Sequence, residues 1–287
     1  GGAAAAGDGG EGEDPAARVY EQPALAALGR VFRSAPPTEL TESETEYVVR
    51  CVRHVLEEHV VLEFRVQNTI DDQLLKQVQV AVELEDEELY RVVAEVPCPR
   101  VRYGQTGSCF VALRRDPARE IELATLGCEL RFNVVEVDPA TGEPDGGPDD
   151  EGFPEEYPLE KLVLAARHYV ARVSLGDFRR SWEQMGESGA AEVTENFALT
   201  KFATLGQAVA GVTEALGLQP ADGTGRVAAA DAEAHQLHLQ GVFAPNVPVL
   251  ARCLFKVHPQ QGLLLQIAVR SEKAEVSQLI SNSIADV

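Results

Sequence analysis

Residues 31–54, VFRSAPPTELTESETEYVVRCVRH, decide the fold of this chain, because a dense run of hydroxyl and carboxylate side chains leads directly into a β-branched strand. Pro36 and Pro37 favour extended backbone and end whatever element precedes them. The residues that follow are strand formers: Tyr47, Val48, Val49, Val52 and Val55. The stretch therefore predicts that a globular β domain begins here.

Length and charge limit what the chain can be. It has 287 residues, of which 45% are hydrophobic, and its 25 Lys and Arg against 46 Asp and Glu give a formal net charge of −21. This is enough material for two domains that each bury a core. The negative charge would repel phosphate backbones and anionic lipid head groups, so nucleic-acid binding is not expected.

Neither a membrane span nor a secretion signal is visible. No window approaches the roughly 20 apolar residues of a spanning helix, and the first residues, GGAAAAGDGGEGED, lack the basic region and apolar core of a signal peptide. We therefore expect a soluble, cytosol-facing protein without direct membrane insertion. In that setting, five widely spaced cysteines without a CxxC motif are expected to be small buried side chains that stay reduced: Cys51, Cys98, Cys109, Cys128 and Cys253.

The first part of the chain reads as a tail followed by a strap. Residues 1–17 combine Gly, Ala and acidic residues without periodicity, which predicts a disordered linker. Residues 18–37 are expected to form an N-terminal strap on the first domain, since Leu25, Leu28 and Val31 have helical spacing.

Residues 38–138 have the period-two pattern of strands almost throughout. About seven short runs, each bounded by Gly, Pro, Asp or Asn, predict an antiparallel immunoglobulin-like β-sandwich. Residues 139–156 are acidic and rich in turn formers, and they lack the register of an EF-hand calcium loop. We interpret them as a solvated linker between two domains.

Residues 157–287 mix helical and strand patterns, which predicts an α+β platform domain. A helix over 205–216 is expected to stop at Gly217, and three strands and a terminal helix follow it. Earlier in this half, Asp177 is expected to cap a short helix whose positions i, i+4 and i+7 share one face: Phe178, Trp182 and Met185.

Catalytic motifs are missing from the sequence. It contains no GxSxG, HExxH or P-loop pattern, and the six histidines are scattered. His235 and His238 lie on one predicted strand at an offset that points them to opposite faces, so paired metal ligation is not expected. We expect no enzyme activity, no cofactor and no metal, although one sequence leaves open a site assembled from distant residues.

One group of residues in the second domain forms a candidate site. Alternation on two adjacent strands places Arg252 and Arg270 on the face opposite the more apolar side. The only tryptophan, Trp182, belongs to the short helix, which is interpreted as exposed, and aromatic and Arg side chains are favoured interface anchors. Two plainer interpretations stay open: each Arg pairs with a neighbouring carboxylate, and Trp182 is a core residue.

Several motifs resemble those of one known family. They are the run 31–54, VQNTIDDQLLKQVQV at 66–80, FRRSW at 178–182, LQGVF at 239–243, VLAR at 249–252 and VRS at 269–271. In these motifs, and over about residues 20–287, the chain resembles the appendage (ear) region of the coatomer gamma subunit of the COPI vesicle coat. The linker also resembles the family, through DPATGEPD at 138–145 leading to DDEGFPEEYPLEKL at 149–162. The Gly/Ala/acidic start, the greater length of the Gly-Pro linker and the loop 221–233 do not match the family pattern.

The resemblance implies an adaptor appendage architecture, mainly β plus α+β, in which an immunoglobulin-like sandwich is followed by a platform. Appendages of this kind recruit accessory proteins and do not catalyse reactions. The family's platform site, an aromatic pair with basic residues, maps onto the candidate residues Phe178, Trp182, Arg252 and Arg270.

The implied partner is an Arf GTPase-activating protein, and other coatomer subunits would be contacted through a trunk that precedes this region in the family. The implied location is cytoplasmic, peripheral on Golgi membranes and COPI vesicles, during Golgi-to-ER and intra-Golgi transport. The alternative is a clathrin-adaptor-type appendage that binds short endocytic motifs.

Overall fold

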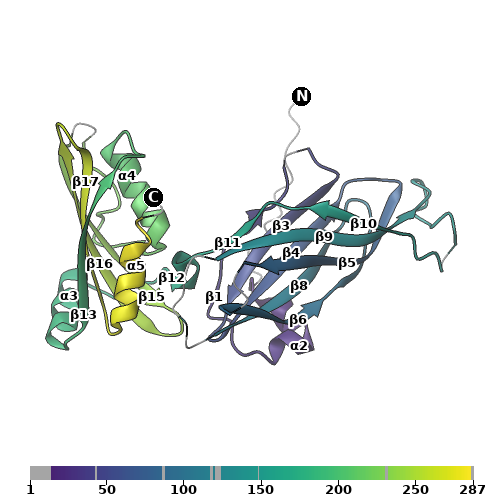
Figure 1. Cartoon of the computed structure of the whole chain (residues 1–287), viewed down its shortest axis with the longest axis horizontal. Helices are drawn as coiled ribbons and strands as arrows, with labels where there is room; N and C mark the ends of the chain where they lie inside the picture. Colours follow the sequence, from purple (N-terminus) through teal and green to yellow (C-terminus); the bar gives the residue numbers. More distant parts are fainter. Residues whose placement is uncertain are drawn as a thin grey trace.

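Three sheets build two lobes, which lie side by side along the long axis of the molecule (Figure 1). The computed structural model describes residues 14–42, 44–85, 88–116, 119, 124–147, 149–229 and 232–285. Two antiparallel sheets face each other in the first lobe, the sandwich, and one antiparallel sheet with helices on both faces forms the second lobe, the platform. The predicted fold class, a mainly β chain with a sandwich followed by an α+β platform, is confirmed.

The sandwich alternates strands between its two sheets. The first sheet has the order β1-β3-β4-β8-β6, with β2 also paired to β3, and contains β1 (Arg33–Ser34), β2 (Thr38–Glu39), β3 (Tyr47–Val55), β4 (His59–Asn68), β8 (Thr106–Arg115) and β6 (Tyr90–Val96). The second has the order β10-β9-β5-β7, with β11 also paired to β9, and contains β10 (Phe153–Pro158), β9 (Ala124–Glu136), β5 (Gln73–Leu84), β7 (Cys98–Val101) and β11 (Leu162–Leu164). Every second side chain along a strand points inward, and these side chains, such as Leu62 and Phe64 on β4, fill the space between the sheets.

Two strands correct the predicted domain boundary. β10 and β11 pair with β9 of the sandwich, so the linker does not extend to residue 156 and the platform does not begin at 157. β10 was missed because its sequence, FPEEYP, has two prolines and no apolar alternation. Such a sequence suits only an edge strand, which is the position β10 takes in its sheet.

The N-terminal segment lies on the outer face of the first sheet. Helices α1 (Ala17–Tyr20) and α2 (Pro23–Ala26) bury Val19 and Leu25 against Val61 and Phe110, while β1 and β2 extend the sheet at β3. Of the expected linker over 1–17, residues 1–13 lie outside the described part of the chain. Asp14 precedes α1 and accepts a hydrogen bond from the backbone N–H of Ala16.

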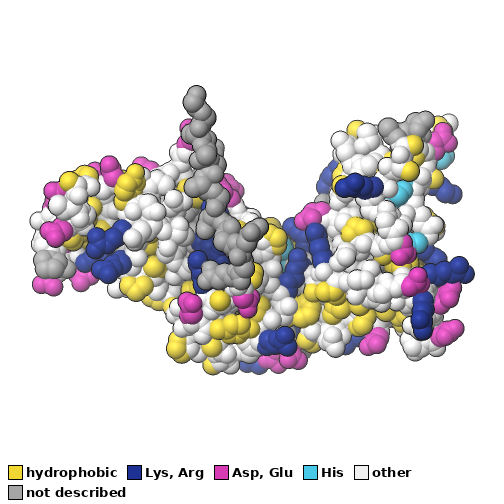
Figure 2. All heavy atoms as spheres, turned by 180° about the vertical axis from the view of Figure 1, so that it is seen from behind, with side chains coloured by type: hydrophobic (Ala, Val, Ile, Leu, Met, Phe, Trp, Pro, Cys, Tyr) yellow, Lys and Arg dark blue, Asp and Glu magenta, His cyan; other side chains and the backbone are white. Residues whose placement is uncertain are grey.

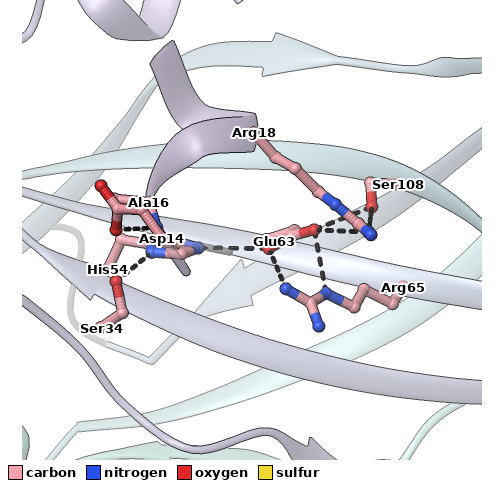
Figure 3. A network of polar contacts seen from close by, with 8 residues as sticks. All are labelled: Asp14, Ala16, Arg18, Ser34, His54, Glu63, Arg65 and Ser108. Carbon is pink, nitrogen blue, oxygen red and sulfur yellow. Dashed lines mark hydrogen bonds and ion pairs between the residues drawn. The ribbon is translucent and has the colours of Figure 1, made fainter. Parts of the chain in front are cut away.

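A buried carboxylate fixes this segment to the sheet (Figure 3). Glu63, on the outer face of β4, is fully buried and accepts from Arg65 Nε at 3.0 Å and from Ser108 Oγ at 2.8 Å. His54 Nε2 lies 3.3 Å from the other carboxylate oxygen, Oε2, and Arg18 Nη1 reaches Oε1 from α1 at 3.4 Å. Burial alone would raise the pKa of Glu63, but these hydrogen bonds and the Arg65 charge lower it to about 2.

The two lobes meet through a buried joint. After β11 the chain forms a 3₁₀ turn, η1 (Ala166–Tyr169), and enters the platform as β12 (Val170–Ala171). The Tyr169 hydroxyl is 2.7 Å from that of Tyr90 on β6, and both rings are buried. Arg33 donates to the backbone carbonyls of Arg167 and Val170, and apolar residues of both lobes form one continuous core. The relative orientation of the lobes therefore depends on packing at this joint.

The platform sheet has the order β12-β15-β16-β17-β13, with β14 paired to β15. Its remaining elements are α3 (Phe178–Glu187), β13 (Ala191–Leu199), α4 (Leu205–Leu216), β14 (Gln219–Pro220), β15 (Ala234–Phe243), β16 (Val247–His258), β17 (Gly262–Ser271) and α5 (Ala274–Asn282). α4 and α5 cover one face with their apolar sides, and α3 lies on the other. The predicted end of α4 at Gly217 is confirmed, since this residue is left-handed with φ 65°. No helix in the described ranges is long and apolar enough to span a membrane.

A Glu63→Gln variant tests the buried network. At neutral pH the free energy of unfolding should fall by about 3 kcal/mol, because two arginines lose their buried carboxylate. The pKa of Glu63 is about 2 in the folded chain, whereas its ordinary value is 4.5. The ionised carboxylate therefore contributes its full stabilisation at pH values above 4.5, and this stabilisation is lost as the pH falls toward about 2. Urea titrations should therefore show the gap between wild type and variant narrowing over this acidic range.

The matched control is Glu39→Gln, which removes an exposed partner of Arg50 and should change the unfolding free energy by less than about 1 kcal/mol. If the difference in unfolding free energy between wild type and Glu63→Gln stays constant down to the lowest pH measured, Glu63 is not ionised in the folded state.

Candidate protein-binding site on the platform

Helix α3 positions the aromatic residues of the candidate site. Asp177 begins it as predicted, because its side-chain oxygen accepts from the backbone N–H of Arg180 at 2.7 Å. One face of the helix then carries Phe178 and Trp182, which are buried, and Met185, which is half-buried. This face packs on the outer side of the platform sheet, opposite α4 and α5.

The burial of Trp182 corrects one expectation. The side chain is only 7% exposed and rests on Leu250, Ala268 and Ala221, so the interpretation of α3 as an exposed helix was wrong for its aromatic face. Leu250 near the start of β16 and Ala268 near the end of β17 are apolar positions on the outer side of the sheet that cluster with the indole. A partner could therefore reach only the edge of this ring.

The four predicted site residues nevertheless lie in one cluster. The guanidinium carbons of Arg270 and Arg252 lie 4.2 Å and 4.8 Å from the centroid of the Trp182 ring, in cation–π geometry. The ring of Phe178 stacks on that of Trp182 at 5.7 Å, and the imidazole of His238 stacks on Phe178 at 4.3 Å.

His238 was not singled out as a site residue by the sequence analysis. Its position directly across from Arg252 in the β15–β16 hairpin register was the signal that could have found it. The expectation that His235 and His238 face opposite sides is confirmed, because the ring of His235 lies near Phe255 on the other face.

The two arginines have different surroundings. Arg270 Nη1 donates to the backbone carbonyl of Trp182 at 2.6 Å, and its Nε pairs with Glu192, so Arg270 holds α3 against the sheet. Gly186 makes room for it, since a Cβ there would lie 2.6 Å from Arg270 Nη1. Among the described residues Arg252 contacts the indole ring and makes neither an ion pair nor a side-chain hydrogen bond. All N–H donors of its guanidinium therefore remain available for a hydrogen bond to another molecule.

A solvent-exposed surface continues from Arg252 along the strand. Two residues on, Leu254 is 37% exposed, and its neighbours across the strands are the amides Gln236 and Gln266. Lys256 follows on the same face and is also exposed. We call these five residues the β16 surface. An apolar side chain between amides and two cations suits a peptide that carries apolar and acidic residues together.

Other chemistry is sparse in the described part of the chain. No group of three or more His, Cys, Asp or Glu there could hold a metal ion. All five cysteines are free, and four are buried while Cys98 is half-buried. Burial raises the pKa of Cys109, Cys128 and Cys253 to about 12, so these thiols stay protonated.

Stability measurements separate the roles of the two arginines. Arg270→Ala should lower the free energy of unfolding by about 2 kcal/mol, because it removes a charged hydrogen bond and an ion pair beneath α3. Arg252→Ala should cost less than about 1 kcal/mol, since it loses only a partly exposed cation–π contact. Guanidinium titrations of both variants check this, and equal losses would assign Arg252 a structural role.

Comparisons with known proteins agree with this architecture. The model of the "Coatomer gamma subunit appendage platform subdomain" matches residues 13–165, which here form the strap and the sandwich. The model of the "Coatomer subunit gamma-1 C-terminal appendage platform" matches residues 167–284. The two models divide the chain at η1, where strand pairing also places the boundary between the lobes.

Curated relatives give the same result. Coatomer subunit gamma-2 of Takifugu rubripes is 36% identical over 263 residues, covering 91% of this chain and 29% of the relative. Coatomer subunit gamma of Arabidopsis thaliana is 35% identical over 92% of this chain and 29% of its own length. Coatomer subunit gamma of Drosophila melanogaster is 35% identical over 95% of this chain and 30% of its own length. The chain thus spans less than a third of these relatives, and it belongs to the coatomer gamma subunit family as a match to its appendage.

Proposed function

We propose that this chain is a protein-recruiting appendage of a COPI coat and that partners bind at the β16 surface. The observation that carries the proposal is the uncommitted guanidinium of Arg252 beside exposed Leu254 on an open part of the platform sheet. Membership of the coatomer gamma family supports a role in the coat. Arg is among the residues that most often anchor protein interfaces, and Arg252 is the residue of this surface that fits that role.

The partner we propose is an Arf GTPase-activating protein, which would bind through a segment carrying acidic and apolar side chains. Phe178, Trp182 and Arg270 support the site from beneath, because they are buried or engaged within the chain. Arg252, Leu254 and Lys256 would make the contacts. In this proposal the appendage acts at the cytoplasmic side of Golgi membranes, in Golgi-to-ER and intra-Golgi transport, and other coatomer subunits hold it in the coat through a preceding trunk.

The alternative is a clathrin-adaptor-type appendage, and a pull-down from cytosol separates the two. Recovery of Arf GTPase-activating protein and coatomer supports the proposal. Recovery of clathrin accessory proteins in their place would favour the alternative.

Two substitutions test the β16 surface with a purified Arf GTPase-activating protein. Arg252→Glu and Leu254→Ser should each weaken binding by about tenfold or more, as loss of an interface anchor does. The loss for Arg252→Glu should be larger at low salt, because charges attract across solvent over a longer distance there. Calorimetric titration measures both effects.

The matched control is Arg226→Glu, which reverses the exposed charge of a residue that is not one of the five of the β16 surface and should change affinity by less than about twofold. Thermal melts of all three variants should stay close to wild type. Binding that survives both Arg252→Glu and Leu254→Ser would place the partner elsewhere on the chain.

A further inference from the structure

A cavity of about 350 Å³ lies at the junction of the two lobes. Strands β1, β2 and β3 supply one wall, and the joint and the start of the platform supply the other. Figure 2 shows Lys and Arg side chains gathered in the hollow between the lobes. The basic groups that line the cavity are Arg33, Arg53, Lys161, Arg167, His168 and Arg172.

Most of this positive charge is not neutralised within the chain. Arg172 pairs with Glu214 at 2.9 Å, and Lys161 approaches Glu85 at 3.5 Å. Arg33, Arg53 and Arg167 have no carboxylate partner among the described residues. Acidic residues outnumber basic ones 46 to 25 in this chain, so carboxylates were available. Three guanidiniums without an ion-pair partner thus lie beside a single lining carboxylate, Glu214, which is paired with Arg172, and such a group favours an anion.

Arg53 gives the sharpest sign of a missing ligand. It occupies an inward position of β3, two residues after the buried Cys51, and its side chain is almost fully enclosed at 4% exposure. Its Nη1 donates to Thr38 Oγ1 at 2.7 Å, but its buried Nε has no hydrogen-bond partner. A buried charge with an unmet donor is costly unless something completes it.

His168 lies among the guanidiniums of the cavity. His168 is buried, and its Nδ1 accepts from the backbone N–H of Ala165 at 2.9 Å. Burial, and then the charges of Arg53, Arg167 and Arg33, lower the pKa of His168 to about 3. The imidazole is therefore neutral at physiological pH, with its proton on Nε2, because the surrounding guanidiniums exclude a further cation.

We propose that this cavity binds a small, multiply phosphorylated anion. Guanidinium groups bind phosphate oxygens in pairs of parallel hydrogen bonds, and three of them on converging walls suit several phosphates on one scaffold. The volume falls in the range of small-ligand sites and exceeds what one phosphate would fill. An inositol polyphosphate, free or as the head group of a phosphoinositide, has this chemistry. Because the walls belong to both lobes, the ligand would also stiffen the joint.

Calorimetric titration with inositol hexakisphosphate near physiological salt tests the proposal. Wild type should bind one molecule per chain, and Arg167→Ala should bind at least about tenfold more weakly. Arg167 suits this test because its side chain has no hydrogen bond or ion pair to lose within the described residues. Arg167→Glu should abolish binding. Absence of saturable binding to wild type would overturn the proposal.

Two controls make the result specific. Arg226→Ala removes the exposed charge of a residue that does not line the cavity, and it should leave affinity within about twofold. An equal loss in both variants would mean nonspecific attraction and would also overturn the proposal. Arg252→Glu should likewise leave this binding unchanged, and Arg167→Ala should leave capture of a protein partner unchanged. The cavity and the β16 surface can therefore fail or succeed independently.

Sedimentation with vesicles identifies the source of the anion. Phosphatidylcholine vesicles that contain a phosphatidylinositol phosphate are compared with phosphatidylcholine alone. Pelleting that requires the phosphoinositide and is lost in Arg167→Ala assigns the site to a lipid head group. Binding of the soluble probe without pelleting assigns it to a free polyphosphate.

Discussion

The hydrogen bond between the hydroxyls of Tyr90 and Tyr169, within an apolar contact, fixes how the two lobes meet. Both hydroxyls are buried, so turning one lobe against the other would leave two polar groups without partners or water. Arg33 adds donors to backbone carbonyls on the far side of the joint. The rest of the molecule follows from this constraint: the cavity keeps its shape because its walls cannot separate, and the platform presents its outer face at a set angle to the sandwich.

Arginines that pair with a carboxylate and arginines that do not have different roles in this acidic chain. Arg18 of α1 meets the buried carboxylate of Glu63, and Arg270 pairs with Glu192 while donating to the backbone carbonyl of Trp182. In both places these contacts fasten a helical segment to a sheet. Arg252 and Arg53, by contrast, have no carboxylate partner in the described ranges. Since pairing is readily available at a net charge of −21, the unpaired positions are where an outside ligand would complete the charge balance.

The sequence predicted those parts of the fold that have strong local patterns. The stop of α4 at Gly217 and the alternation of β4 depend on near neighbours, and both were recognised. β10 was not, because its pairing with β9 comes from a contact between distant segments. Alternation placed Arg252 and Arg270 on one face, helical spacing aligned Phe178 with Trp182, and the family resemblance joined the four into one site. The burial of Trp182, however, depends on how closely α3 packs on the sheet. The burial of Glu63 similarly requires the strap above it.

The position of Trp182 has a practical consequence. It is the only tryptophan of the chain, so near-ultraviolet excitation of indole reports on a single place in the molecule. The guanidinium carbons of Arg252 and Arg270 lie 4.8 Å and 4.2 Å from the centroid of its ring, and the side chain is almost completely shielded from solvent. Any event that draws Arg252 away from the ring changes the polarity that the indole experiences, and with it the colour and intensity of its emission. The platform thus contains a natural fluorophore beside the β16 surface, so proposed binding there can be followed without an attached label.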